Sequence, residues 1–186
     1  MTADNEPDTT VEVVEADPSW AGAFEVERRR LTGACPAAVR VEHIGSTSVP
    51  GLAAKPTIDV LLVLPARRDL TAAIPTLEGL AYQYVPESFA ADPDHLFLHR
   101  IHGGKRSHHL HVVAASSPLT DRYLLFRDYL RAQPEAAARY EAVKRDLAVR
   151  YPTQRDRYVD EKPAAVERLL AEADRWKASA SGRRSA

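Results

Sequence analysis

The segment from Val41 to Val60 constrains the fold more than any other part of the chain. β-Branched residues run up to Gly45-Ser46 and are typical of a strand, which this flexible, hydroxyl-bearing pair then ends with a turn. Residues 58–64 are apolar enough for a strand covered on both faces, apart from the single carboxylate of Asp59. The segment therefore predicts a strand, a Gly-Ser turn, a short helix and a buried second strand.

This order of elements is the outline of a nucleotide site. Backbone N–H groups in such a turn, beside a helix start, can hold phosphate oxygens. An acid on the neighbouring strand can hold a divalent cation that bridges those phosphates. The alternatives are that Ser46 and its neighbours are plain turn or capping residues, and that Asp59 only pairs with Lys55 or an arginine. A carboxylate in so apolar a strand is costly without a partner, which favours the functional interpretation.

The same segment resembles the signature of the GrpB family, which belongs to the nucleotidyltransferase superfamily of folds. The superfamily pattern is Gly-Ser, a spacer, and then Asp-x-Asp or Asp-x-Glu on a strand. Gly45-Ser46 and Asp59 match it, with residues 47–58 as the spacer, but Leu61 stands where the second acid is expected. The resemblance implies that Ser46, with the amides around Gly45 and Thr47, is the phosphate cradle. It also implies that Asp59 binds the metal.

Further motifs extend the resemblance from Trp20 to roughly Ala173. They are His-His-Leu-His-Val at 108–112, Phe-Arg-Asp-Tyr-Leu-Arg at 126–131, and Tyr140, Lys144, Tyr158 and Lys162. From this helical part we carry only Arg127 and Lys144 as possible rim residues of the nucleotide pocket. The Lys55 ammonium either points at phosphate or neutralises Asp59.

Six of the seven histidines lie between His95 and His111, on two predicted neighbouring strands. Strand alternation puts His109 and His111 on one face and His108 on the other. His109 and His111 converge with Asp59 if strands 58–64 and 108–113 are adjacent. By the resemblance, His111 stands at or near the place of a third acid.

Three roles remain open for His109 and His111. With Asp59 they form a ligand set that suits a transition metal better than Mg²⁺. They are alternatively a general base and its hydrogen-bond partner. The third alternative is a pair of satisfied polar side chains on a half-exposed sheet, which we prefer for His95, His99 and His102. Arg100, Lys105 and Arg106 either supply charge for a polyphosphate or are solvated residues near a hairpin tip.

Charge and cysteine content exclude several classes of protein. The formal net charge of -1 gives no global attraction to nucleic acid, so a nucleic-acid partner is not expected. Cys35 is the only cysteine, which excludes an intrachain disulfide. No apolar run approaches membrane-spanning length and the first residues are acidic, so we expect a cytoplasmic protein without a membrane partner. The Ala- and Arg-rich composition is typical of a GC-rich bacterium.

The pattern along the chain predicts one α/β (α+β) domain over 11–176 between disordered tails at 1–10 and 177–186. Its elements form a nucleotidyltransferase-like mixed sheet flanked by helices, with a C-terminal helical layer. The predicted strands are 11–15, 39–44, 58–64, 82–85, 95–101 and 108–113. The predicted helices follow Asp17 and cover 69–79, 120–132, 135–150 and 158–176.

The function that follows is a GrpB-like nucleotidyltransferase. It would bind a nucleoside triphosphate with Mg²⁺ and transfer the nucleotidyl group to an unknown small-molecule or protein acceptor. One alternative is a non-catalytic nucleotide- or coenzyme-binding module that has lost the second metal carboxylate. The other is a transition-metal enzyme built on His109, His111 and Asp59.

Overall fold

The computed structural model describes residues 10–182 and contains a five-stranded mixed sheet. The sheet order is β1-β2-β5-β4-β3, with β1 at Arg40–Ile44, β2 at Ile58–Leu64, β3 at Gln83–Tyr84, β4 at His95–His102 and β5 at Lys105–Ala114. The helices are α1 at Ser19–Ala34, a 3₁₀ turn η1 at Ser46–Ser48, α2 at Arg67–Glu78, α3 at Leu119–Ala132, α4 at Pro134–Arg150 and α5 at Arg155–Gly182. The predicted α/β class with a C-terminal helical layer is confirmed.

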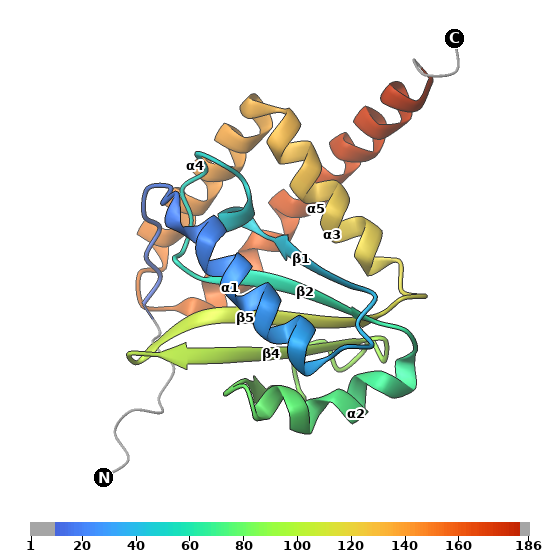
Figure 1. Cartoon of the computed structure of the whole chain (residues 1–186). Coiled ribbons are helices and arrows are strands. Elements are labelled where there is room, and N and C mark those ends of the chain that lie inside the picture. The colour runs from blue at the N-terminus through green and yellow to red at the C-terminus, as the bar shows by residue number, and fades with distance from the viewer. Residues whose placement is uncertain (1–9, 183–186) are drawn as a thin grey trace.

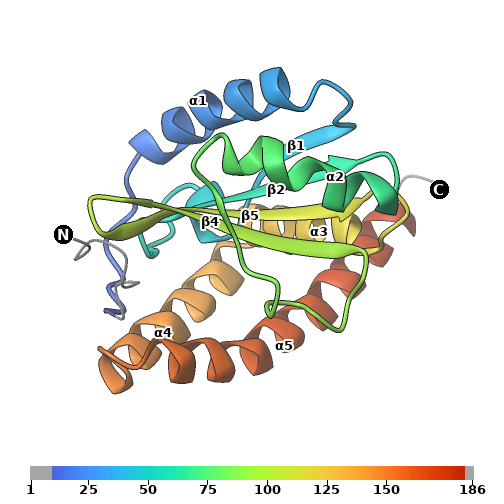
Figure 2. The same cartoon turned by 90° about the horizontal axis from the view of Figure 1, so that it is seen from below.

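Helices cover both faces of the sheet, as Figures 1 and 2 show, with α1 and α2 on one face and α3, α4 and α5 on the other. Strand β2 is apolar on both faces because both are covered. Val60 and Leu62 pack in the cluster that includes α1 and α2, whereas Leu61 and Val63 pack against α3. The buried core is therefore divided into two layers by the sheet.

The centre of the sheet joins β2 in parallel to β5, and β5 pairs antiparallel with β4. Asp59 lies directly opposite His109, and His109 lies opposite His99 on β4. The predicted adjacency of strands 58–64 and 108–113 is confirmed. Because opposite residues of a ladder share a face, these three side chains all point toward the layer of α3, α4 and α5.

A β-bulge interrupts the β4–β5 hairpin. Arg100 pairs with His108, but the next residue, Ile101, pairs with Arg106, so Ser107 is an extra residue on β5. Such a bulge changes the face to which the following side chains point. It places Arg106 on the same face as His109, although the two are three residues apart.

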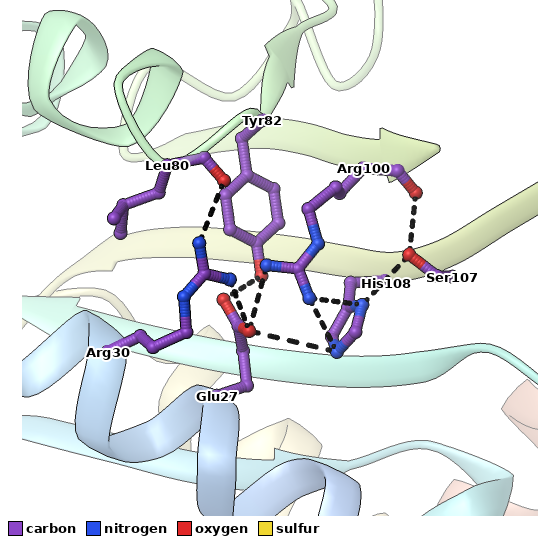
Figure 3. A network of polar contacts seen from close by, with 7 residues as sticks. All are labelled: Glu27, Arg30, Leu80, Tyr82, Arg100, Ser107 and His108. Atoms are coloured by element: carbon purple, nitrogen blue, oxygen red, sulfur yellow. Dashed lines mark hydrogen bonds and ion pairs between the residues drawn. The ribbon is translucent and has the colours of Figure 1, made fainter. Parts of the chain in front are cut away.

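A buried ion network joins α1 to the sheet on the opposite face (Figure 3). Glu27, only 1% exposed, accepts a hydrogen bond from the Tyr82 hydroxyl at 3.0 Å and pairs with Arg30 and Arg100, each at 2.9 Å. Arg100 also donates to the His108 ring. A buried carboxylate is tolerated only with such partners, so this network fixes where α1 sits on β4 and β5.

Several boundaries differ from the sequence prediction. The predicted strand at 11–15 is only an isolated bridge between Val14 and Ala54. Helix α2 begins at Arg67, before its predicted start at 69, and α5 runs to Gly182, past its predicted end at 176. The parts of the predicted tails at 1–9 and 183–186 lie outside the described residues. No helix in the described part of the chain is long and apolar enough to cross a membrane.

Replacing Glu27 with leucine tests the network. We expect the free energy of unfolding to fall by about 3 kcal/mol, because Arg100 would remain buried without its carboxylate. Urea denaturation measures this change. The matched control is Glu25→Leu on the same helix, whose solvent-screened ion pair with Arg28 contributes little to stability. Equal losses in the two variants would contradict the proposed importance of the buried pair.

Candidate active site

The site is centred on Asp59 and His109, whose Oδ1 and Nδ1 atoms lie 2.8 Å apart. Burial raises the pKa of Asp59, but the hydrogen bond from His109 and the nearby positive charges together hold that pKa at about 2. The carboxylate is therefore ionised and can only accept, so His109 Nδ1 donates. Burial lowers the pKa of His109, which leaves its ring neutral and gives Nε2 a free lone pair.

The Gly-Ser turn is held against this pair. Gly45 has a φ of 68°, and a Cβ atom at this position would lie 2.2 Å from Asp59 Oδ2. Only glycine combines this backbone conformation with so close an approach. The predicted turn therefore brings the backbone of Gly45 directly against the carboxylate and places Ser46 on the wall of the adjacent cavity.

A cavity of about 1300 Å³ opens beside the pair. Its wall includes the predicted Ser46, Lys55, Asp59, His109, His111 and Lys144, together with Arg106 and Lys162 and the first turns of α5. Typical small-molecule pockets measure roughly 300–1,000 Å³. The cavity therefore has room for a nucleotide and a second small molecule.

Three lysines give the cavity its positive charge. Lys144 is 2% exposed and donates to the Ala53 carbonyl oxygen, and burial lowers its pKa to about 7. Burial also lowers the pKa of Lys55, to about 8, whereas the Tyr140 hydroxyl raises that of Lys162. None of the ion pairs found between residues 10 and 182 involves any of these lysines. Such ammonium groups are stabilised when an anion enters.

His111 occupies the aromatic side of the cavity. Its Nδ1 lies 2.9 Å from His95 Nε2 and 3.0 Å from the Tyr123 hydroxyl, and burial lowers its pKa to about 3. His95 is thus a satisfied polar side chain, as the sequence predicted. Phe89 lies over His95 with ring centroids 4.1 Å apart and is 47% exposed.

The side chains of two predicted nucleotide-site residues make contacts within the fold. Thr47 is buried, with its Oγ1 atom 3.0 Å from His43 Nε2 and 3.3 Å from the Thr57 carbonyl oxygen. Arg127 donates to Glu42 and to the His43 carbonyl oxygen, and the residues of the cavity wall do not include it. These contacts hold β1 and η1, and the roles of the Thr47 amide and of Arg127 in nucleotide binding stay predictions.

The residues do not form a preassembled metal cage. Within the described part of the chain, no group of three or more His, Cys, Asp or Glu residues is placed to hold a metal ion. Leu61, at the position of the second acid, is fully buried against Val113 and the residues of α3. The three-ligand transition-metal centre therefore gains no support. A single carboxylate, Asp59, still fits a mostly hydrated Mg²⁺ held by substrate phosphates.

Sequence reasoning undervalued two cavity residues. The sequence leaves Arg106 open between a charge for a polyphosphate and a solvated residue near a hairpin tip, and the bulge turns it inward. Lys162 belongs to the motifs at 140–162, but its position relative to Asp59 depends on how α5 packs. A lysine and a tyrosine at helical spacing on both α4 and α5 were the available signal.

Gly45→Ala and Gly51→Ala form a matched pair of tests. Both glycines have positive φ, but a Cβ atom at Gly51 meets nothing within 4 Å. We expect Gly51→Ala to cost about 1–2 kcal/mol of backbone strain. Gly45→Ala should cost more, because the clash displaces Asp59. Urea denaturation measures the free energy of unfolding of both variants. Equal behaviour of the variants would contradict the close Gly45–Asp59 contact.

The fold resembles that of solved nucleotidyl-transferring enzymes. The Cid1 poly(U) polymerase, in a structure with MgGTP bound, superimposes with a TM-score of 0.51 at 16% identity. The match covers 74% of this chain and 45% of that chain. At this identity the likeness establishes the fold alone, and it confirms the nucleotidyltransferase-like sheet.

Closer similarity lies among bacterial proteins. A UPF0157 protein of Pseudomonas aeruginosa is 42% identical over 91% of this chain and 70% of its own length. The UPF0157 protein YqkA of Bacillus subtilis is 35% identical, and the chain spans 49% of its length. The structure of the conserved protein GrpB from Enterococcus faecalis has a TM-score of 0.78 at 34% identity, over 87% of this chain and 96% of that one. Because the family model described as GrpB protein also matches residues 10–172, the chain belongs to the GrpB family.

Proposed function

We propose that this protein binds a nucleoside triphosphate in the cavity and transfers its nucleotidyl group to a small-molecule acceptor. The observation that carries this proposal is the set of ammonium groups on the cavity wall, the buried Lys144 and the partly buried Lys55 and Lys162, which have no carboxylate in an ion pair and lie around an ionised Asp59. A polyanion would supply the missing negative charge. The fold agrees, since Cid1 was solved with MgGTP bound.

The triphosphate would be held from two sides. The hydroxyl of Ser46 on the cavity wall provides a donor from the β1–β2 connection. The three lysines approach from the loop before β2 and from α4 and α5. Mg²⁺ bound with the triphosphate would neutralise charge on the reacting phosphates, with Asp59 Oδ2 as its protein ligand.

The Asp59–His109 pair supports acceptor activation. His109 Nε2, buried and without a hydrogen-bond partner among the described residues, is placed to take a proton from an acceptor O–H. The acceptor oxygen then attacks the α-phosphorus, the bond from that phosphorus to the bridging oxygen breaks, and pyrophosphate leaves. Asp59 stabilises the imidazolium that forms and keeps Nδ1 protonated, as a carboxylate does in a catalytic triad.

A non-catalytic nucleotide-binding module is the second candidate. Leu61, in place of the second acid, favours it because the metal then has one protein carboxylate instead of two. Such a module would bind triphosphate through the lysines with little dependence on Mg²⁺ and without turnover.

Calorimetric titration with ATP, CTP, GTP and UTP, with and without Mg²⁺, distinguishes these functions. For the transferase we expect Mg²⁺ to strengthen binding and Asp59→Asn to abolish that gain, while lysine-dependent binding persists. Once an acceptor is supplied, pyrophosphate release measures turnover, and we expect Asp59→Asn to lose it. Mg²⁺-independent binding that is unchanged in Asp59→Asn would favour the binding module. No binding of any triphosphate would refute both.

Lys144→Met should separate binding from stability. We expect triphosphate affinity to fall about tenfold or more, because one charge-assisted contact is lost. The free energy of unfolding at pH 7 should rise by about 1 kcal/mol, since a buried, uncompensated ammonium is removed. Titration and urea denaturation measure the two quantities. A variant that loses both affinity and stability would instead show a structural lysine.

The pH dependence of binding follows from the same lysines. The pKa of Lys144 is about 7 and that of Lys55 is about 8, both below the ordinary lysine value. Bound phosphate would raise both pKa values. Binding therefore takes up protons, and affinity should decrease as pH rises from about 6.5 to about 9. Isothermal titration in buffers of different ionisation enthalpy counts these protons. Lys144→Met should reduce the count, and an affinity that rises with pH would contradict the assignment.

A further inference from the structure

We propose that Arg106 and His99 form a subsite for an anionic group of the acceptor, so that the acceptor is a small alcohol or amine carrying a carboxylate or phosphate. This inference rests on the proposed function and names the class of its second substrate. It is carried by the β-bulge at Ser107 and by three buried nitrogens that share one face of the sheet.

The bulge is what creates this subsite. If Ser107 were paired as in a regular strand, Arg106, two residues before His108, would share its face and point toward α1 and α2. Because Ile101 pairs with Arg106, the arginine instead lies on the cavity wall beside the strand position of His109. Its backbone carbonyl accepts a hydrogen bond from Thr57 Oγ1 at 2.9 Å, which fixes this part of β5 next to the start of β2. Bulges beside active sites commonly redirect a side chain in this way.

Three nitrogens on this face of the sheet are buried and have no hydrogen-bond partner in the described part of the chain, and two of them belong to residues of the cavity wall, Arg106 and His109. They are Arg106 Nε, His99 Nδ1 and His109 Nε2. His99 is 7% exposed and lies opposite His109 in the ladder. Buried polar atoms nearly always have a hydrogen-bond partner. Three buried nitrogens without one on the same face therefore indicate a polar group that is bound during function.

The chemistry of the three atoms differs. Arg106 Nε can only donate a hydrogen bond, and burial together with the charge of Arg106 keeps His99 neutral, with one ring N–H to donate. Both suit an anion. His109 Nε2 carries the lone pair and instead accepts, which suits an O–H or N–H. A ligand that satisfies all three therefore has a nucleophilic O–H or N–H and an anionic group on the same small molecule.

The position of this subsite separates it from Ser46. In the sheet order, Ser46 follows β1, and Asp59 on β2 and His109 on β5 come next, ahead of His99 on β4. The Asp59–His109 pair therefore lies between the Gly-Ser turn and His99, as a transfer between two ligands requires. Asp156 on the same wall adds negative charge near Arg106, but the ion pairs found among the described residues do not include Arg106.

The test uses calorimetric titration of the whole protein saturated with Mg²⁺ and inorganic tripolyphosphate. The probes are glycerate and glycerol 3-phosphate, which pair a hydroxyl with a carboxylate or a phosphate, and glycerol as the uncharged control. We expect at least one anionic probe to bind and glycerol not to bind. Tighter binding of glycerate would indicate a carboxylate acceptor, and tighter binding of glycerol 3-phosphate would indicate a phosphate acceptor.

Three variants assign the site. Arg106→Met should lower the affinity for the anionic probe about tenfold and the affinity for tripolyphosphate less than about twofold. Lys144→Met should do the reverse. Lys105→Met is the matched control, because this neighbouring cation is exposed and pairs with Glu12 at 3.7 Å, so it should change neither. Thermal unfolding confirms that each variant is folded, and Arg106→Lys replaces Arg106→Met if that variant is not.

Two results would overturn the inference. Arg106 belongs to the triphosphate site if Arg106→Met weakens tripolyphosphate as much as Lys144→Met does. The subsite does not exist if tripolyphosphate binds but neither anionic probe does. Failure of tripolyphosphate itself to bind would instead refute the proposed function, and direct titration of the probes into wild type and Arg106→Met would then still decide whether Arg106 binds an anion.

Discussion

The parallel pairing of β2 with β5 is the constraint on which the rest of the structure depends. It joins residues about fifty positions apart and sets Asp59 opposite His109. The same register directs Val60 and Leu62 toward α1 and α2, and Leu61 toward α3. A slip of one residue would reverse every side chain, so the apolar layers and the Asp59–His109 pair are specified together. The core residues of β2 are thus also positioning residues for the site.

Adjacent histidines on β5 serve opposite faces of the sheet. His109 meets Asp59 in the cavity, whereas His108 meets Arg100, which pairs with Glu27. Arg100 is also the last residue of β4 before the register shifts at the bulge. The buried network on the α1 face therefore anchors the strand pair at the point where Arg106 is turned into the cavity. A change in Glu27 is expected to act on the site through this anchor, without touching a ligand.

How much the sequence predicts varies with the kind of interaction. Local patterns were sufficient for the Gly-Ser turn, for Asp59 on a buried strand and for the alternation of His109 and His111. Their meeting needed the strand order, which came from the family resemblance. The bulge that turns Arg106 inward was not predictable, because one extra residue in a hairpin leaves no mark in composition or periodicity. The contacts of Arg127 were not predictable for a similar reason, since its pairing with Glu42 depends on how α3 packs on β1.

The two faces of the sheet treat buried charge in opposite ways, and this contrast supports a ligand site. On the α1 face, Glu27 is surrounded by Arg30, Tyr82 and Arg100, so its charge is compensated within the fold. In the cavity, Lys144 is almost as deeply buried, yet its ammonium contacts the Ala53 carbonyl oxygen and the Tyr140 ring and forms none of the ion pairs found among the described residues. The fold thus surrounds the buried charge of Glu27 with partners but gives the ammonium of Lys144 no ion pair. Natural sequences depart from local stability rules mainly at functional sites, and lysines without an ion pair in a cavity are such a departure. The proposed anionic substrate would supply the partner that they lack.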